Sequence, residues 1–119
     1  MKKMMKDWLR KHPDVRTIRV AAADLNGQAR GKRVPARFAE NVVKNGTRFP
    51  FSVLNLDIWG EEIDDSPLVF EKGDQDGILR PTERGFMPMP WLEAPTALLP
   101  IWMFRENGTP YEGDPRHAL

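Results

Sequence analysis

Five carboxylates surround Trp59 and Gly60 in the middle of the chain: Asp57, Glu61, Glu62, Asp64 and Asp65. Carboxylates attract a cation by ion pairing, and the face of an indole ring attracts it through the ring quadrupole. A cationic amine offers both a charge and carbon atoms to such a group. The segment is therefore suited to binding an amine, and the alternative interpretation is an ordinary solvated acidic loop.

A second acidic segment, Asp74-Gln75-Asp76-Gly77, resembles the start of a calcium-binding loop. The full loop needs a further oxygen ligand at the position of Ile78, and a bidentate glutamate beyond it. The sequence supplies neither of them. This segment therefore predicts a turn and no metal site.

Arg30, Lys32 and Arg33 form a basic cluster. The cluster could hold a phosphate or an acidic partner, or it could lie on a solvated or subunit-bridging strand. A nucleic-acid groove is not indicated, because the net charge is only +1 and no aromatic residues are interleaved with the cations.

The other chemistry-bearing residues do not form a catalytic pattern. His12 and His117 are far apart in the sequence, and we do not expect a metal or catalytic pair from them. Pro88-Met89-Pro90-Trp91 could be an exposed polyproline ligand, but its Met and Trp favour packing against apolar surface. No serine lies in a nucleophile elbow and no glycine run has P-loop spacing. We therefore expect no catalytic residue, cofactor or metal within this chain.

The composition fits one globular domain. With 119 residues, 40% of them hydrophobic, the chain is long enough to bury a core. The absence of cysteine excludes a disulfide framework and a thiolate metal site. No apolar run approaches the length of about 20 residues that a membrane span needs. We expect a cytoplasmic protein with neither nucleic acid nor membrane as a partner.

Hydrophobic periodicity predicts the elements of the first half. A short helix carries Met4, Met5, Trp8 and Leu9 and ends at His12-Pro13. A strand over residues 16–22 then turns at Asn26-Gly27 and returns over residues 28–34. Pro35 opens a second helix that ends at Asn45-Gly46, with the pairs Phe38–Val42 and Ala39–Val43 on one side. Residues 51–58 alternate as another strand.

Two short extended pieces, at residues 68–70 and 77–80, and a last strand over residues 96–104 complete the prediction. The order indicates an α+β fold of the β-grasp type, in which a mixed sheet packs on one main helix. The last strand is apolar on both faces: Ala97, Leu99, Ile101 and Met103 on one, and Leu98, Trp102 and Phe104 on the other. One helix, about 10 Å wide, covers only one face of a sheet. We expect another domain or subunit to cover the second.

The last residues begin a new element. Asp114 is a good N-cap, and Pro115 suits the first position of a helix. We therefore expect residues 1–113 to form one domain and residues 114–119 to begin a second domain of a longer polypeptide.

Several segments, taken in order, resemble the N-terminal domain of the glutamine synthetase family. They are Asp24-Leu25-Asn26-Gly27 with Arg30-Gly31-Lys32, Gly73-Asp74-Gln75-Asp76-Gly77 with Pro81-Thr82, Met89-Pro90-Trp91 with Pro95-Thr96-Ala97, and Gly108-Thr109-Pro110 with Asp114-Pro115-Arg116. Trp59-Gly60 and Arg84-Gly85-Phe86-Met87-Pro88 resemble the branch that joins glutamate to amines larger than ammonia, the gamma-glutamylputrescine synthetase type.

This resemblance implies an ATP-dependent glutamate–amine ligase. In the family a small β-grasp domain precedes a large catalytic domain that binds ATP, glutamate and Mg²⁺ or Mn²⁺, and the subunits form homo-oligomeric rings. Each active site lies between the catalytic domain of one subunit and the β-grasp domain of its neighbour. The chain alone is then expected to be inactive. We expect Ser52, Asp57 and Trp59 to face the neighbouring active site, although the pleat of the predicted strand sends Ser52 and Asp57 to opposite faces.

One departure from the family motif bears on the substrate. The ammonia-using branch carries Phe-Asp-Gly-Ser-Ser, whose aspartate helps to bind ammonium, and the best match here is Phe49-Pro50-Phe51-Ser52-Val53. Pro50 replaces that aspartate, and Phe51 would add an apolar wall. We therefore expect a polyamine or another alkylamine as the nucleophile. The competing hypothesis is a stand-alone β-grasp adaptor without enzymatic activity.

Overall fold

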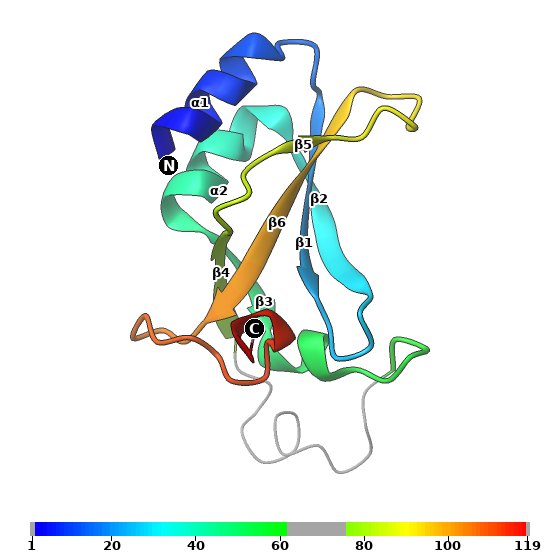
Figure 1. Cartoon of the computed structure of the whole chain (residues 1–119), viewed down its shortest axis with the longest axis vertical. Helices are drawn as coiled ribbons and strands as arrows, with labels where there is room; N and C mark the ends of the chain where they lie inside the picture. Colours follow the sequence, from blue (N-terminus) through cyan, green and yellow to red (C-terminus); the bar gives the residue numbers. More distant parts are fainter. Residues whose placement is uncertain (1, 62–75, 119) are drawn as a thin grey trace. The chain divides into compact units, whose positions relative to one another are not determined.

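A computed structural model of the chain describes residues 2–61 and 76–118 (Figure 1). Two compact units share the chain. The first unit comprises residues 1–21, 31–46 and 80–101, and the second comprises residues 22–30, 47–79 and 102–119. In chain order, the elements are α1 (Lys2–Lys11), β1 (Thr17–Ala23), β2 (Ala29–Pro35), η1 (Ala36–Phe38), α2 (Ala39–Asn45), β3 (Thr47–Pro50), η2 (Phe51–Asn55), β4 (Asp76–Pro81), β5 (Met87–Pro88), β6 (Thr96–Phe104) and η3 (Pro115–Ala118), where η marks a 3₁₀ helix.

The strands form a mixed sheet in the order β2-β1-β6-β4-β3, with β5 beside β6. β1 runs parallel to β6, with Thr17 opposite Thr96. The pairs β3–β4 and β5–β6 are antiparallel. A mixed sheet with few helices confirms the predicted α+β, β-grasp-like fold. The predicted hairpin is also confirmed, because β2 lies next to β1 in this order.

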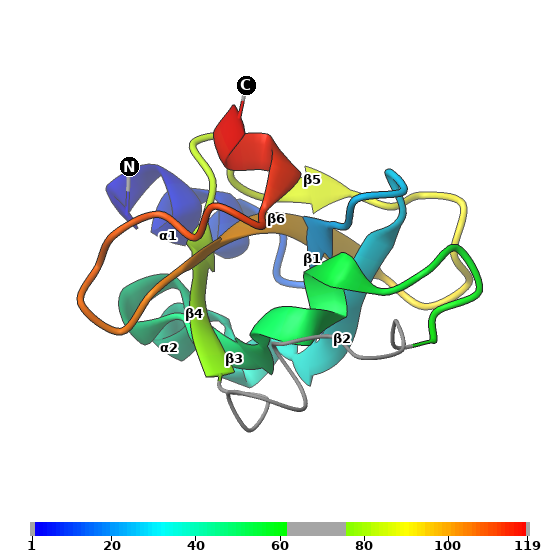
Figure 2. The same ribbon diagram turned by 90° about the horizontal axis from the view of Figure 1, so that it is seen from below.

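The first helix of the first unit forms as predicted. Met5 is buried, and the ring nitrogen Nδ1 of His12 hydrogen-bonds the backbone oxygen of Trp8 at 2.7 Å. This bond and Pro13 end α1, because proline cannot continue the hydrogen-bond ladder. α1 and α2 lie side by side, as both Figure 1 and Figure 2 show.

The second helix differs in part from the prediction. A 3₁₀ turn, η1, precedes it, so the regular helix begins at Ala39 rather than after Pro35. Val42 and Val43 are buried as expected, but Phe38 is 47% exposed. Phe38 lies in the 3₁₀ turn and contributes less to the buried side of this segment than Val42 does. Gly46 ends the helix with a φ of 75°.

The last strand, β6, matches its predicted bounds and its predicted alternation. Ala97, Leu99, Ile101 and Met103 are completely buried. On the other face, Leu98, Trp102 and Phe104 are only half-buried. The first face of β6 is thus core, and the second is partly open.

The second unit corrects the strand predicted over residues 51–58. Pro50 ends β3, and Phe51–Asn55 form the 3₁₀ helix η2. Phe51 and Leu54 are buried three residues apart, which is the 3₁₀ period, and the Leu25 N–H donates to Leu54 O at 3.1 Å. Since residues 51–58 are not pleated, the expected opposition of Ser52 and Asp57 across a strand does not apply.

The segment after β6 folds back onto the end of that strand. The buried Asp114 accepts the Met103 N–H at 2.7 Å through Oδ2, and the Arg116 N–H at 2.9 Å through Oδ1. His117 donates from Nε2 to Met103 O at 2.7 Å. Its ring stacks on Trp102, with 4.9 Å between the ring centroids. The predicted cap at Asp114 is confirmed, and part of the cover over Trp102 comes from the chain itself.

The strand predicted at residues 77–80 is confirmed as β4, whereas residues 68–70 lie outside the described residues. Among the described residues, every helix is too short or too polar to cross a membrane. The cytoplasmic location and the domain boundary at residue 113 stay predictions.

Candidate functional site

The Asp24 turn, residues 24–30, joins β1 to β2 and is organised by one buried carboxylate. Oδ1 of Asp24 accepts the backbone N–H groups of Asn26 at 2.8 Å and Gln28 at 2.9 Å. Oδ2 accepts the Nε–H of Arg30 at 2.9 Å. An aspartate that caps a turn in this way fixes the local backbone, and here the guanidinium also balances the buried charge.

The environment of Asp24 favours its ionised form. Burial by itself raises the pKa of the carboxyl, but the Gln28 N–H and the Arg30 side chain, assisted by the Asn26 N–H, act in the opposite direction. The net result is a pKa for Asp24 below its ordinary value. This carboxylate therefore stays charged and hydrogen-bonded through the physiological pH range.

The Trp59 loop, residues 56–61, is a second turn with its own internal cap. Oδ1 of Asp57 accepts the N–H groups of Trp59 and Glu61, each at 2.9 Å. The Asp57 N–H donates to Glu61 O at 2.9 Å, and the Gly60 N–H donates to Asp57 O at 3.0 Å. Gly60 has a φ of +83°, a conformation that favours glycine. Asp57 thus shapes the loop from which the Trp59 side chain extends.

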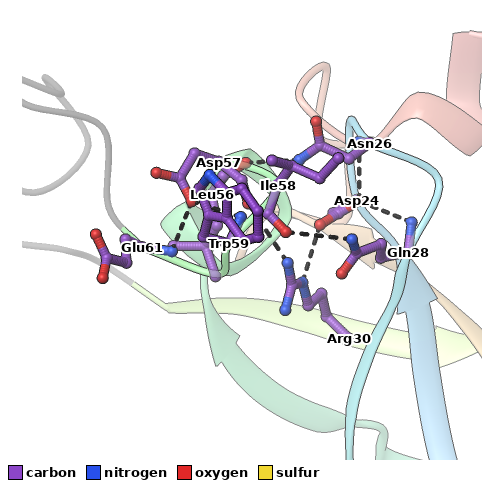
Figure 3. A network of polar contacts seen from close by, with 9 residues as sticks. All are labelled: Asp24, Asn26, Gln28, Arg30, Leu56, Asp57, Ile58, Trp59 and Glu61. Carbon is purple, nitrogen blue, oxygen red and sulfur yellow. Dashed lines mark hydrogen bonds and ion pairs between the residues drawn. The ribbon is translucent and has the colours of Figure 1, made fainter.

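Side chains of the Asp24 turn hold the backbone of the Trp59 loop (Figure 3). Asn26 donates from Nδ2 to Leu56 O at 3.0 Å, and Gln28 donates from Nε2 to Ile58 O at 3.2 Å. Arg30 reaches Asp57 O with Nη2 at 3.5 Å, a weak hydrogen bond. Two segments that lie about thirty residues apart are thereby tied together at three successive carbonyl groups.

The structure brings two of the three predicted site residues into one loop. The Trp59 side chain is 85% exposed, and the partly buried Asp57 lies two residues before it. Ser52 lies instead in η2 and is buried. Of the predicted acidic group, Glu61 belongs to the loop, whereas Glu62, Asp64 and Asp65 lie outside the described residues.

Several other sequence candidates take different roles. Arg30, a member of the predicted basic cluster, has an acidic partner within the chain, the buried Asp24. Phe51, expected to form a substrate wall, is buried against Tyr111 with 4.5 Å between the ring centroids. Trp91, expected to pack on apolar surface, is 70% exposed. Asp76 begins β4, and Asp74 and Gln75 lie outside the described residues.

The sequence prediction missed the amide side chains of Asn26 and Gln28. Asn26-Gly27 predicted the turn, but no local pattern signals that these amides reach a loop near residue 57. Within residues 2–61 and 76–118, no group of three or more histidine, aspartate or glutamate side chains is placed to hold a metal ion.

Comparisons with known proteins test the predicted family resemblance. No family model matches the chain. A solved complex of GmaS with ADP aligns with 96% of this chain and 23% of its own, at 25% identity and a TM-score of 0.70. A structure described as a glutamine synthase homologue aligns with 88% of this chain and 25% of its own, at 21% identity and a TM-score of 0.74, which supports the fold alone. The predicted resemblance to the N-terminal domain of the glutamine synthetase family is confirmed.

A similarity to one characterised protein bears on the predicted subfamily. The chain is 30% identical over 115 residues to gamma-glutamylputrescine synthetase PuuA of Escherichia coli (strain K12). The match covers 97% of this chain but only 24% of that relative. It supports a ligase-family domain and the predicted subfamily resemblance.

Proposed function

We propose that the chain is the N-terminal domain of an ATP-dependent glutamate–amine ligase and completes the active site of the adjacent subunit. Residues 1–113 would form this domain, and residues 114–119 would begin the catalytic domain. In the proposed assembly, a homo-oligomeric ring, the Trp59 loop faces the neighbouring catalytic domain. The amine substrate is an alkylamine or polyamine.

The observation that carries this proposal is the anchored loop with its exposed indole. Trp59 is 85% exposed and follows Ile58, which is also more than half exposed, and exposed apolar groups that cluster in this way mark interaction surfaces. Three hydrogen bonds from the Asp24 turn hold the backbone of the loop, so the main chain that carries the Trp59 side chain is fixed in position. The similarity to a gamma-glutamylputrescine synthetase supports an amine as the ligand of this loop.

The proposed reaction has two steps. The γ-carboxylate of glutamate takes the terminal phosphoryl group of ATP, which releases ADP. The neutral amine then attacks the acyl carbon of γ-glutamyl phosphate, the acyl–oxygen bond breaks, and phosphate leaves as the amine nitrogen loses a proton. Trp59 would contact the carbon chain and the ammonium form of the amine, while the carboxylates of Asp57 and Glu61 would attract its charge. These contacts favour binding and orientation rather than the chemical step.

ATP and its Mg²⁺ or Mn²⁺ would be held by the catalytic domain. The described part of this chain offers no carboxylate or histidine group that fits a divalent metal. Its contribution is therefore the shape and charge of the amine side of the site. Ser52 stays the weakest of the three proposed site residues, since its side chain is buried in η2 and would need a change in η2 to reach a ligand.

The first test is an assay of the full-length protein for phosphate release with ATP, glutamate and a panel of amines. The panel contains ammonium, methylamine, putrescine and a longer polyamine. We expect higher kcat/KM for the alkylamines than for ammonium. A preference for ammonium would contradict the proposed substrate class, and no phosphate release with any amine would contradict the proposed enzyme and favour the adaptor hypothesis.

The second test concerns Trp59 itself. We expect Trp59→Ala to raise the KM for putrescine by about tenfold, as the loss of a cation–π and apolar contact implies, with little change in kcat or in stability. The matched control is Trp91→Ala, because Trp91 is also largely exposed but lies in the first unit. Equal effects of the two substitutions would contradict a specific role for the Trp59 loop.

A further inference from the structure

A cavity of about 290 Å³ lies in the first unit, between the end of α1 and the proline-rich segment before β6. Its walls include the rings of Trp8 and His12, which stack with 3.8 Å between their centroids. The stacked rings and the prolines of residues 88–95 give the cavity a rigid, apolar wall. A small organic molecule fits a space of this size.

The indole N–H of Trp8 is a donor, but the other polar side chains that line the cavity offer mainly acceptors. Asp14 and Glu93 contribute carboxylates, which only accept hydrogen bonds when ionised. The hydroxyl of Thr96 already donates to Ala94 O at 2.9 Å, which leaves its oxygen lone pairs. No lysine or arginine is among the described residues that line the cavity.

His12 fits the same pattern. The partner of its Nδ1 is the carbonyl oxygen of Trp8, at 2.7 Å, and a carbonyl can only accept. Nδ1 therefore carries the proton in the neutral ring, and Nε2 carries a lone pair. The excess of acceptors over donors favours a ligand that brings hydrogen-bond donors and positive charge together with an apolar body.

We propose that this cavity binds a small organic ammonium ion, such as an alkylamine or a diamine. The ammonium group would lie toward the carboxylates of Asp14 and Glu93, and the carbon chain would lie along the wall formed by Trp8 and His12. The inference goes beyond the proposed function, because it assigns an amine site to the first unit, whereas the Trp59 loop belongs to the second. It is a binding site, and it requires no chemical step.

The probe for this site is 1,4-diaminobutane, added to the full-length protein labelled with ¹³C at the methionine methyl groups. Met89 lines the cavity, whereas Met103 is completely buried in the second unit and serves as the internal reference. The Met89 resonance is assigned with Met89→Leu. We expect a saturable shift of Met89 and no shift of Met103. The uncharged analogue 1,4-butanediol and the dianion succinate should leave Met89 unchanged.

Substitutions that remove the negative charges of the cavity test whether these charges attract the ammonium group. Asp14→Asn and Glu93→Gln should each weaken the binding of 1,4-diaminobutane by about threefold, and by about tenfold together, because both side chains are exposed and solvent screens them. The control is Glu83→Gln, since Glu83 is exposed in the same unit but does not line the cavity. Turnover at saturating amine should be unchanged in all of these variants.

Four outcomes overturn the proposal: no saturable Met89 shift, an equal response to 1,4-butanediol, binding of succinate instead, or an equal loss in Glu83→Gln. The readout is binding and does not depend on turnover. A protein that binds the diamine at Met89 but releases no phosphate would contradict the proposed ligase function and leave this site standing. An active ligase without the Met89 shift would support the proposed ligase function and contradict the proposed site in the first unit.

Discussion

Asp24 shows how one buried side chain can organise a site that it does not touch. Its carboxylate makes the turn whose side chains, Asn26, Gln28 and Arg30, hold the Trp59 loop. The carboxylate itself contacts none of the loop carbonyl groups that these donors reach. Its role is therefore to position the loop, through the residues that it fixes.

We expect Asp24→Asn to lower the free energy of unfolding by about 2 kcal/mol at pH 7, because it leaves the half-buried Arg30 without its charged partner. The pKa of Asp24 is lowered in the folded state, so its contribution is present above the unfolded-state value of about 4 and lost as the pH falls below it. Urea unfolding at several pH values checks both statements.

The control for this experiment is Asp14→Asn, because Asp14 is exposed. It should keep the stability and the acid response of the parent protein. If Asp24→Asn loses no stability at pH 7, or if its stability falls with acid as steeply as that of the parent, the assigned role of Asp24 is wrong.

At the scale of residues, the sequence predicted those features that depend on hydrogen bonds between near neighbours in the chain. Asn26-Gly27 predicted the turn, and Asp114 predicted the cap, because each bond joins residues two to four positions apart. The contacts of Asn26 and Gln28 with residues 56 and 58 are thirty positions away, and nothing in either segment specifies the other. Trp59 and Asp57 could be chosen by chemistry alone, but their anchoring could not.

At the scale of elements, β2 depends on a glycine. A Cβ atom added at Gly31 would lie 1.7 Å from the backbone oxygen of Val20 in β1. No rotamer change relieves this contact, because the obstructing atom belongs to the main chain. Steric crowding therefore explains why position 31 is glycine. This glycine belongs to the Arg30-Gly31-Lys32 segment, which is part of the family resemblance.

We expect Gly31→Ala to force β2 away from β1 and to lower the free energy of unfolding by about 3 kcal/mol, at the upper end for an overpacked site. Urea denaturation followed by circular dichroism measures the loss. Gly108→Asn is the matched control, since Gly108 has a φ of +88°, which asparagine tolerates, and open space around it. Similar losses for both variants would contradict the steric explanation.

The elements also show why one strand was predicted wrongly. Residues 51–58 have apolar side chains at alternating positions, which fits a strand, but Phe51 and Leu54 equally fit a 3₁₀ turn. Hydrogen-bond partners outside the segment favour the 3₁₀ helix over the strand. Asn55 donates to Gly113 O at 3.2 Å and accepts from the Tyr111 hydroxyl at 2.6 Å. In β6, by contrast, Ala97, Leu99, Ile101 and Met103 are buried at every second position, a period that a 3₁₀ helix does not share.

At the scale of the whole molecule, the proposed assembly needs an apolar surface. Leu25, Ile58 and Trp59, all in the second unit, are each more than half exposed. Leu25 belongs to the Asp24 turn, and the other two belong to the Trp59 loop. Exposed apolar groups of this size in anchored segments are typical of surfaces that another chain covers.

We expect Ile58→Glu to weaken the association of full-length subunits by at least about tenfold, because a charge would have to be buried at the interface. Sedimentation velocity measures the shift toward smaller species. Phe38→Glu is the control, since Phe38 is exposed to a similar degree in the first unit. An unchanged oligomer in Ile58→Glu, or an equal effect in Phe38→Glu, would contradict the proposed interface.

The backbone of Met103, near the end of β6, has no hydrogen-bonding group left over. Its N–H is taken by Asp114, and its carbonyl accepts from both the Tyr111 N–H and His117. A buried backbone group that loses its partner costs about 1 to 3 kcal/mol. Because Tyr111, Asp114 and His117 supply these partners, removal of the segment after β6 would leave both backbone groups of the buried Met103 unsatisfied and would destabilise the end of the strand.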